Sequence, residues 1–156
     1  MLVHKVAGAT AAKGGSLEEV KAAALKVSGA VSTLGVCLKV CTLPGKQPSD
    51  RLGEGEIEIG LGIHGEPGKV KTQNMAVDAL VERMLDQLVA SRHFGGPLVE
   101  GEGLVVLVNN LGATTPLEMC LVTRALLSLL AHKYKVKVLR SYTGPLMTSL
   151  DMAGMR

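Results

Sequence analysis

A histidine that could act as a nucleophile stands in the segment Glu56–Gly68, which reads EIEIGLGIHGEPG. Apolar residues alternate with others up to the histidine, and successive side chains of a strand point to opposite faces. The apolar face carries Ile57, Ile59, Leu61 and Ile63. The other face is reduced to bare backbone at Gly60 and Gly62, just before His64. A histidine beside two glycines is typical of contact with a small molecule, and a surface or packed histidine is the alternative.

The segment Gly62–Gly68 resembles the active-site segment of the substrate-binding (DhaK-type) part of dihydroxyacetone kinases. Further stretches resemble motifs of the same family, in the same order along the chain. They are LVHKVAGA at 2–9, SLEEV at 16–20, CTLPG at 41–45, VNNLG at 108–112 and MTSLDMAG at 147–154. The resemblance therefore covers essentially the whole chain.

The resemblance implies an α/β fold, namely a two-layer sandwich of a mixed β-sheet with helices packed on one face. It also implies that His64 is the catalytic residue, which holds the ketone substrate as a hemiaminal on a ring nitrogen. We expect Gly60, Gly62, Gly65 and Glu66 to form the substrate-binding surroundings. The glycines let the substrate approach the backbone, and Glu66 orients the turn or the imidazole.

The expected function is that of the substrate-binding part of a dihydroxyacetone kinase. Glycerol has no carbonyl carbon, so a covalent histidine adduct would select short keto or aldehyde trioses over polyols. The alternative is a non-catalytic ketone-binding or regulatory relative that captures its ligand without phosphoryl transfer. The phosphoryl donor, either ATP or a phosphoprotein relay, stays open, as does cyclisation of flavin dinucleotide.

The same resemblance leads us to expect that residues 1–156 form a single domain of a longer kinase. Nothing here matches the family's N-terminal substrate domain or its helical nucleotide-binding domain. We therefore expect ATP and magnesium on a separate domain or subunit, no cofactor or metal in this chain, and no kinase activity from the chain alone. A homodimer is also expected.

Composition narrows the possible classes of protein. The chain has a net charge of +3 and only three aromatic residues, so we do not expect a nucleic-acid-binding surface. No apolar run reaches the roughly 18 residues of a transmembrane helix, and the N-terminus does not read as a secretory signal. Three cysteines argue against a disulfide framework, so we expect a cytoplasmic protein. Cys37 and Cys41 would lie roughly 13 Å apart along a strand, too far to share a metal.

Strands and helices are expected to alternate along the chain. The expected strands are Leu2–Ala7, Val36–Leu43, the His64 segment, Leu104–Val108 and Lys135–Tyr142, and the expected helices are 16–31, 74–90 and 115–132. Two helix starts carry capping boxes, Ser16 with Glu19 and Thr115 with Glu118. The strand Leu104–Val108 is expected to be buried on both faces. Residues 44–55 and 92–103 are expected to be loops.

Other chemical interpretations are weaker. Gly60–Gly65 has the spelling of a dinucleotide fingerprint, but Pro67 interrupts the chain where that motif must open into a helix. His4, His93 and His132 are expected to be structural rather than catalytic. The pair Asn109-Asn110 is expected to serve the turn after its strand, and Lys133, Lys135 and Lys137 to form a solvated strand face.

Overall fold

The computed structural model describes residues 1–64, 66–91 and 98–156. The chain forms two compact units. The first comprises Met1–Ser32 with Leu88–Pro97, and the second comprises Thr33–Gln87 with Leu98–Arg156.

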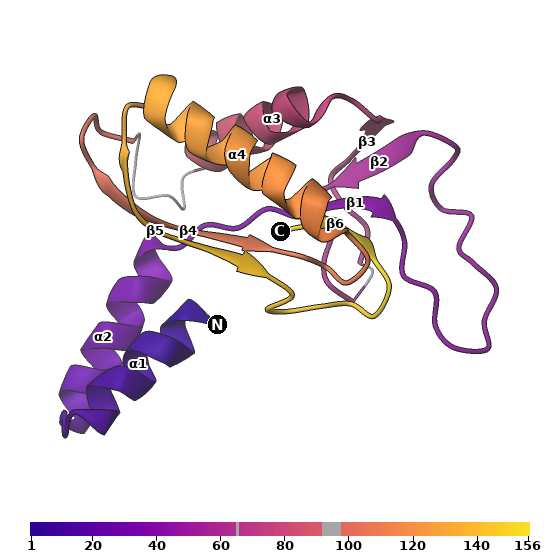
Figure 1. Cartoon of the computed structure of the whole chain (residues 1–156). Coiled ribbons are helices and arrows are strands. Elements are labelled where there is room, and N and C mark those ends of the chain that lie inside the picture. The colour runs from indigo at the N-terminus through magenta and orange to yellow at the C-terminus, as the bar shows by residue number, and fades with distance from the viewer. Residues whose placement is uncertain (65, 92–97) are drawn as a thin grey trace. The chain divides into compact units, whose positions relative to one another are not determined.

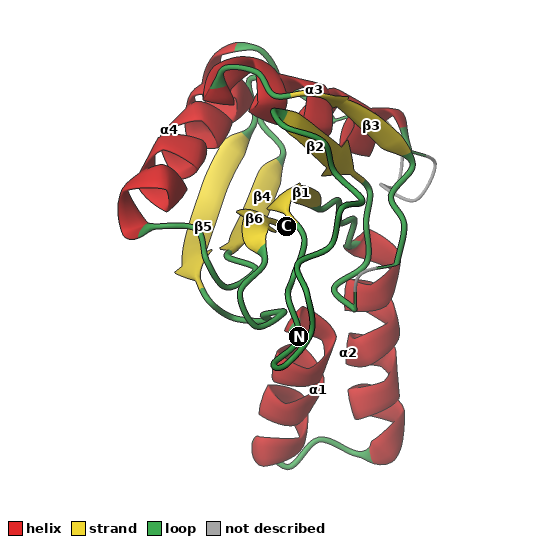
Figure 2. Ribbon diagram, turned by 90° about the vertical axis from the view of Figure 1, so that its right-hand side faces the viewer, coloured by secondary structure: helices red, strands yellow, loops and turns green. Residues whose placement is uncertain are grey.

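A helical hairpin makes up most of the first unit. Helix α1 (Leu2–Ala12) and helix α2 (Leu17–Ala30) lie side by side and are joined by a short loop (Figure 2). The predicted capping box starts α2: the Ser16 hydroxyl accepts from the Glu19 N–H, and the Glu19 carboxylate accepts from the Ser16 N–H at 2.7 Å. This pair satisfies two N–H groups that the first turn of a helix leaves without partners.

The strand predicted at Leu2–Ala7 is wrong, because these residues belong to α1. The half-buried residues of this helix are Leu2, Val3, Ala7 and Thr10. Val3, Ala7 and Thr10 follow one another at intervals of four and three residues, which places them on one side of a helix, whereas a strand would bury every second residue. His4 therefore lies on α1, where its side chain is exposed.

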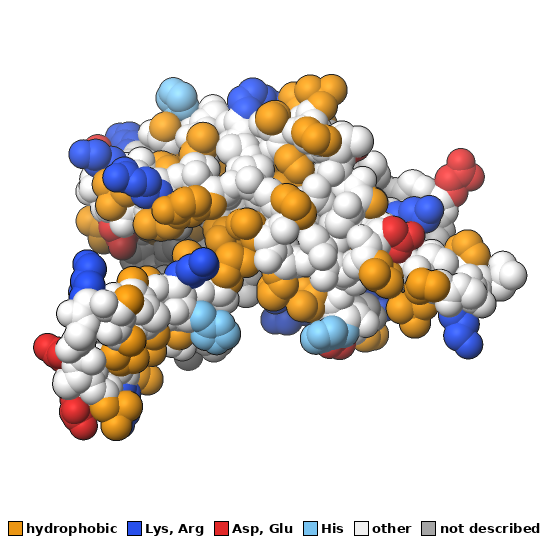
Figure 3. All heavy atoms as spheres, turned by 60° about the horizontal axis from the view of Figure 1, so that its bottom comes forward, with side chains coloured by type: hydrophobic (Ala, Val, Ile, Leu, Met, Phe, Trp, Pro, Cys, Tyr) orange, Lys and Arg blue, Asp and Glu red, His pale blue; other side chains and the backbone are white. Residues whose placement is uncertain are grey.

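The hairpin leaves apolar side chains at its surface. No residue of α1 or α2 is fully buried. Leu17 is 77% exposed and Leu25 is 61% exposed, and hydrophobic side chains are visible along the hairpin in Figure 3. Two helices alone enclose too little volume to bury their apolar residues completely.

The second unit is built on two sets of strands. An antiparallel sheet has the order β3-β2-β1-β6, and β4 pairs in parallel with β5. The bounds are β1 (Val36–Lys39), β2 (Glu56–Ile59), β3 (Val70–Gln73), β4 (Gly103–Asn109), β5 (Lys137–Gly144) and β6 (Ala153–Met155).

The C-terminal strand joins the two sets. Asn109 and Arg156 exchange two backbone hydrogen bonds of 2.8 Å, and the Leu111 N–H donates to the Gly154 carbonyl at 3.1 Å. An isolated bridge pairs Asn110 with Met155. The described strands therefore form one mixed sheet, as predicted.

Two helices pack on one face of this sheet, α3 (Val77–Ala90) and α4 (Pro116–His132) (Figure 1). The main core lies between them and the strands. Its buried residues are Val36, Ile57, Ile59, Leu80, Val81, Met84, Val108, Met119, Val122, Ala125 and Met155. A smaller cluster of Cys37, Leu61, Leu111 and Met152 forms a second buried group. Burial raises the pKa of the Cys37 thiol to about 11. The predicted two-layer α/β arrangement is confirmed for this unit.

Several element boundaries differ from the sequence expectation. The Thr115 capping box starts α4 as predicted, but Asn74 accepts from the adjacent Met75 N–H and α3 begins only at Val77. Strand β3 was not expected, because its sequence VKTQ is mostly polar. Val105 of β4 is 51% exposed, so that strand is not buried on both faces.

The expected position of Lys133 on a strand face is also wrong. Lys133 follows the helix rather than lying on a strand. Its ammonium pairs with Glu82 and Asp86 of α3, each at 2.8 Å. Of the loop expected at 92–103, residues 92–97 lie outside the described residues, and 98–102 carry no helix or strand.

The contact of β6 with β1 predicts the effect of Gly154→Ala. A Cβ at Gly154 would lie 2.1 Å from the Val36 carbonyl oxygen, so the two strands would have to separate. We expect a loss of about 2 kcal/mol or more in the free energy of unfolding, measured by urea denaturation. Gly144→Ala is the matched control, since a Cβ there meets nothing within 4 Å. Equal midpoints for the two variants would contradict this description of β6.

Candidate active site

His64 lies on the turn between β2 and β3. β2 ends at Ile59, and Gly60 then adopts a φ of +87°, a left-handed conformation that favours glycine. The Gly60 N–H donates to the Gly35 carbonyl at 2.7 Å, which fixes the start of the turn on the neighbouring chain segment. The Lys69 N–H donates to the Ile59 carbonyl at 2.9 Å and closes its base. The turn thus presents His64 beyond the end of a paired strand.

Glu66 contacts His64 through both carboxylate oxygens. Oε2 accepts from the His64 backbone N–H at 3.1 Å, and Oε1 lies 3.0 Å from the ring Nδ1. Both side chains face solvent, with 80% of the His64 side chain and 57% of the Glu66 side chain exposed. A single carboxylate therefore fixes both the backbone and the ring of the histidine.

The charge on Glu66 determines which ring nitrogen carries the proton. A hydrogen bond from its own backbone N–H, followed by the hydrogen bond with the His64 ring, lowers the pKa of Glu66. An ionised carboxylate can only accept, so Nδ1 of His64 is the donor in this contact. In the neutral imidazole, Nε2 then carries a lone pair, which is the form that attacks an electrophilic carbon.

The glycines of the turn make room for the glutamate. A Cβ at Gly62 would lie 1.9 Å from Oε2 of Glu66, so the carboxylate occupies the space that any other residue would fill. The Gly62 N–H donates to the Glu66 carbonyl at 3.3 Å. The structure therefore brings together Gly62, His64 and Glu66, places Gly60 at the start of the turn, and leaves Gly65 outside the described residues.

Glu58 is a residue of this region that the alternating pattern misassigned. The pattern placed it on the open face, but it is only 1% exposed. Its carboxylate pairs with Arg51 at 2.7 Å and accepts from the Gly68 N–H at 2.8 Å. The sequence signal that could have shown this burial is Arg51, the arginine of the loop before β2.

The remaining candidate residues lie in structural positions. His132 ends α4, and its ring Nδ1 lies 2.9 Å from the Ser128 carbonyl oxygen. The Asn109 side chain is buried and bonded to the backbone of Leu146 and Met147, not to the turn after its strand. The Asn110 side chain does serve that turn, through bonds to the backbone of Gly112 and Thr114. His93 lies outside the described residues. Cys37 is buried, Cys41 is half-buried and Cys120 is exposed, and all three are free thiols.

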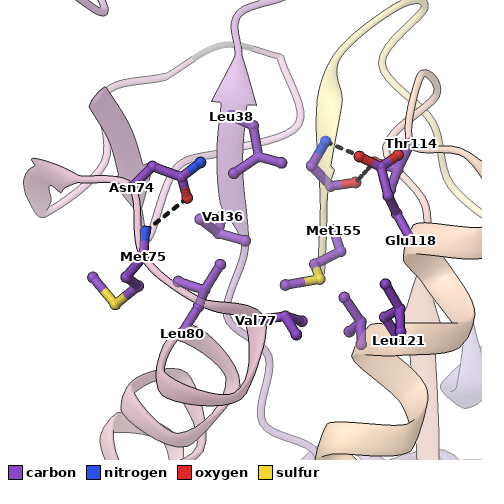
Figure 4. Close-up of a pocket in the computed structure, with 12 residues that line it drawn as sticks. Val36, Leu38, Asn74, Met75, Val77, Leu80, Thr114, Glu118, Leu121 and Met155 are labelled. Carbon is purple, nitrogen blue, oxygen red and sulfur yellow. Dashed lines mark hydrogen bonds between the residues drawn. The ribbon is translucent and has the colours of Figure 1, made fainter. Parts of the chain in front are cut away.

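A separate cavity of about 170 Å³ lies on the helix face of the sheet (Figure 4). Apolar side chains such as Leu38, Leu80 and Met155 line it, with Asn74 and Glu118 among its few polar groups. None of the described residues of the His64 turn lines this cavity. Where the structure describes the chain, it places no three His, Cys, Asp or Glu side chains to hold a metal ion. Likewise, none of the described helices has the length and apolar character needed to cross a lipid bilayer.

The sequence family that matches this chain is the Dak1 domain, over residues 1–156. The chain is 46% identical over 154 residues to a putative 3,4-dihydroxy-2-butanone kinase of Solanum lycopersicum, which covers 99% of the chain and 26% of that protein. It is 41% identical over 156 residues to the dihydroxyacetone-binding subunit DhaK of a PTS-dependent dihydroxyacetone kinase of Listeria innocua, covering 99% of the chain and 46% of the subunit.

Among solved structures, the dihydroxyacetone kinase operon co-activator DhaQ superposes with a TM-score of 0.90 at 33% identity. The match covers 99% of the chain and 46% of DhaQ. The chain thus spans less than half the length of each of these three relatives. That it is one domain of a longer protein stays a prediction.

The contact between Glu66 and His64 predicts how the turn titrates. Since the folded-state pKa of Glu66 is lowered, the contact is present above the usual carboxyl range and is lost as the pH falls through the lowered pKa. We expect His64→Ala to raise the pKa of Glu66 part of the way, because the bond from its own backbone N–H remains. Carbon-13 NMR of the side-chain carboxyl measures this change.

Glu118 is the internal control for that titration. Hydrogen bonds from Thr115 lower its pKa, and His64 takes no part in them. The pKa of Glu118 should therefore be the same in the wild type and in His64→Ala. An unchanged pKa of Glu66 in the variant would refute the contact with the ring.

Proposed function

Because this chain belongs to the Dak1 domain family, we propose that it is the substrate-anchoring part of a dihydroxyacetone kinase. The observation that carries the proposal is His64, whose Nδ1 donates to Glu66 and whose Nε2 is left to act as a nucleophile on an exposed turn. Homologues of the chain are named as dihydroxyacetone-binding and dihydroxybutanone kinase proteins, which agrees with a short ketone as the ligand.

Capture proceeds by addition of the imidazole to the ketone. Nε2 of His64 forms a bond to the carbonyl carbon while the π bond of the C=O group breaks. The carbonyl oxygen takes up one proton, and Nδ1 releases one through the adjacent Glu66 carboxylate to solvent, so the product is a neutral hemiaminal. Glycerol offers no carbonyl carbon and is not captured. The bond orients a terminal hydroxyl of the ketone for in-line attack on a phosphoryl group.

The turn supplies the immediate surroundings of the captured ketone. We assign Gly60, Gly62 and Gly65 to the binding of the ketone, as the resemblance implies, and Glu66 to the orientation of the imidazole. Since the Glu66 carboxylate lies against Gly62, the ligand approaches the ring from its Nε2 side.

Phosphoryl transfer needs groups beyond this chain's own. We assign ATP and Mg²⁺, or a phosphoprotein relay in their place, to a separate nucleotide-binding domain or subunit, and expect no phosphoryl transfer by the chain alone. Such a partner, or a second copy of the chain, would also cover the apolar side chains Leu117 and Leu121 of α4, which are 71% and 42% exposed.

A second candidate function is ketone capture without phosphoryl transfer. The observation that favours it is the TM-score of 0.90 with a protein described as an operon co-activator. Both candidates use the same adduct on His64. They differ in whether a nucleotide-binding partner turns the captured ketone into a phosphate ester, which a coupled assay with the isolated partner measures.

Carbon-13 NMR of dihydroxyacetone labelled at its carbonyl carbon tests the capture. We expect a new sp³-type carbon signal with the wild type and its loss in His64→Ala, because the alanine has no nucleophile. The His64 side chain is 80% exposed, so circular dichroism of the variant should match the wild type. His132→Ala is the matched control, since it removes another exposed histidine and should leave the signal in place.

A new signal that persists in His64→Ala would overturn the assignment of the nucleophile. The absence of a signal in every protein would mean that the chain alone does not capture the ketone. Repeating the measurement with a longer parent protein would then decide whether a further domain closes the site.

A further inference from the structure

A buried carboxylate lies directly beneath the His64 turn. Glu58 occupies the middle of β2, which pairs with β1 on one side and β3 on the other. Its side chain is only 2% exposed. Carboxylates are seldom buried to this degree unless they are paired, because removing the charge from water is costly.

The two oxygens of Glu58 have different partners. Oε2 lies 2.7 Å from Nη2 of Arg51, and Oε1 accepts from the Gly68 backbone N–H at 2.8 Å. The Arg51 carbonyl in turn accepts from Nζ of Lys71, on β3, at 2.6 Å. One carboxylate therefore connects the loop before β2 with the end of the His64 turn, and β3 holds that loop from its other side.

There is no space for a side chain at position 68. A Cβ there would lie 2.7 Å from Cγ of Glu58 and 2.7 Å from the Ile59 carbonyl oxygen. The turn backbone thus packs directly on the Glu58 side chain. Because β2 is paired on both sides, this contact holds the solvent-exposed turn in a fixed position relative to β2.

We propose that Glu58 is the positioning residue of the His64 turn, paired with Arg51 and acting through the Gly68 N–H. This proposal rests on the proposed function for what the turn captures. Glu58 does not touch the ligand. It fixes the end of the turn at Gly68, while Glu66 fixes the imidazole of His64. Without the hydrogen bond from Gly68 to Glu58, the turn would sample conformations in which Nε2 of His64 is not presented for addition, and capture would weaken.

The test separates the hydrogen bond from the charge. Removing one partner alone would leave a buried charge without compensation, so the variants change both residues. Arg51→Met with Glu58→Gln removes both charges and keeps an oxygen that can accept from Gly68. Arg51→Met with Glu58→Leu removes both charges and the acceptor. If the leucine variant fails to fold by circular dichroism, Arg51→Met with Glu58→Met replaces it.

Three readouts are compared on the folded proteins. They are hydrogen exchange at the Gly68 amide, the nitrogen-15 shifts of the His64 ring, and capture of carbonyl-labelled dihydroxyacetone by carbon-13 NMR. We expect the glutamine variant to behave like the wild type in all three. In the leucine variant, exchange at Gly68 should rise about tenfold and capture should fall about tenfold, as expected for loss of a hydrogen bond to a buried acceptor.

Thr114→Val is the matched control. The Thr114 hydroxyl donates to the Gly154 carbonyl at 2.7 Å and accepts from the Gly154 N–H at 2.9 Å (Figure 4), so the variant also removes buried side-chain bonds to the backbone. No contact that the structure describes for the His64 turn involves Thr114. A general loss of stability would therefore lower capture in this variant too, whereas loss of positioning would not.

The proposal would be overturned if a folded leucine variant kept wild-type capture and wild-type exchange at Gly68. It would also be overturned if Thr114→Val lost as much capture as the leucine variant. If even the wild type captures no ketone, the function proposed for this chain fails, and the positioning role is then decided by Gly68 exchange and the His64 ring shifts. Unchanged exchange and shifts would refute it, and rescue of both by glutamine would support it.

Discussion

The second unit depends on the insertion of β6 between β1 and the segment after β4. β6 has only three residues, yet it bonds to Val36 and Cys37 on one side and faces Asn110 on the other. The close approach requires glycine at position 154, where a side chain would meet the Val36 carbonyl. Met155 and Met152, in and beside this strand, reach two separate apolar clusters. A short strand therefore unites two sets of strands and supplies both cores.

Two glutamates near His64, one on β2 and one on the turn after it, differ in burial. Glu58 is buried on a central strand, where Arg51 and a backbone N–H compensate its charge. Glu66, eight positions along the chain, is exposed and held by its own backbone N–H and by His64. Burial limits the first to contacts within the protein, whereas exposure leaves the second able to exchange protons with water. The chemistry that we propose needs both kinds of carboxylate.

Local chemistry predicted the parts of this structure that local contacts determine. Ser16 and Thr115 begin helices because their capping boxes are formed within four residues. The strand predicted up to His64 instead ends at Ile59, because Gly60 turns the chain with a φ of +87° and its N–H bonds to the Gly35 carbonyl. The helix at Leu2–Ala12 was missed because a few apolar residues fit either period until a partner helix selects one face. The burial of Glu58 was missed because its partner Arg51 lies in an irregular loop, and β6 because three residues carry no pattern.

The exposure of His64 suits the turn to ketone capture but not to phosphoryl transfer. A histidine that is 80% exposed can add to a ketone reversibly, since that step needs only a lone pair and orientation. Transfer of a phosphoryl group needs a site closed to water, because water competes for the phosphoryl group and weakens the electrostatic contacts that stabilise the transition state. Under the proposed function, the turn therefore supplies orientation, and the surface that carries the phosphoryl donor supplies closure. Under the second candidate function, ketone capture without phosphoryl transfer needs the first part alone.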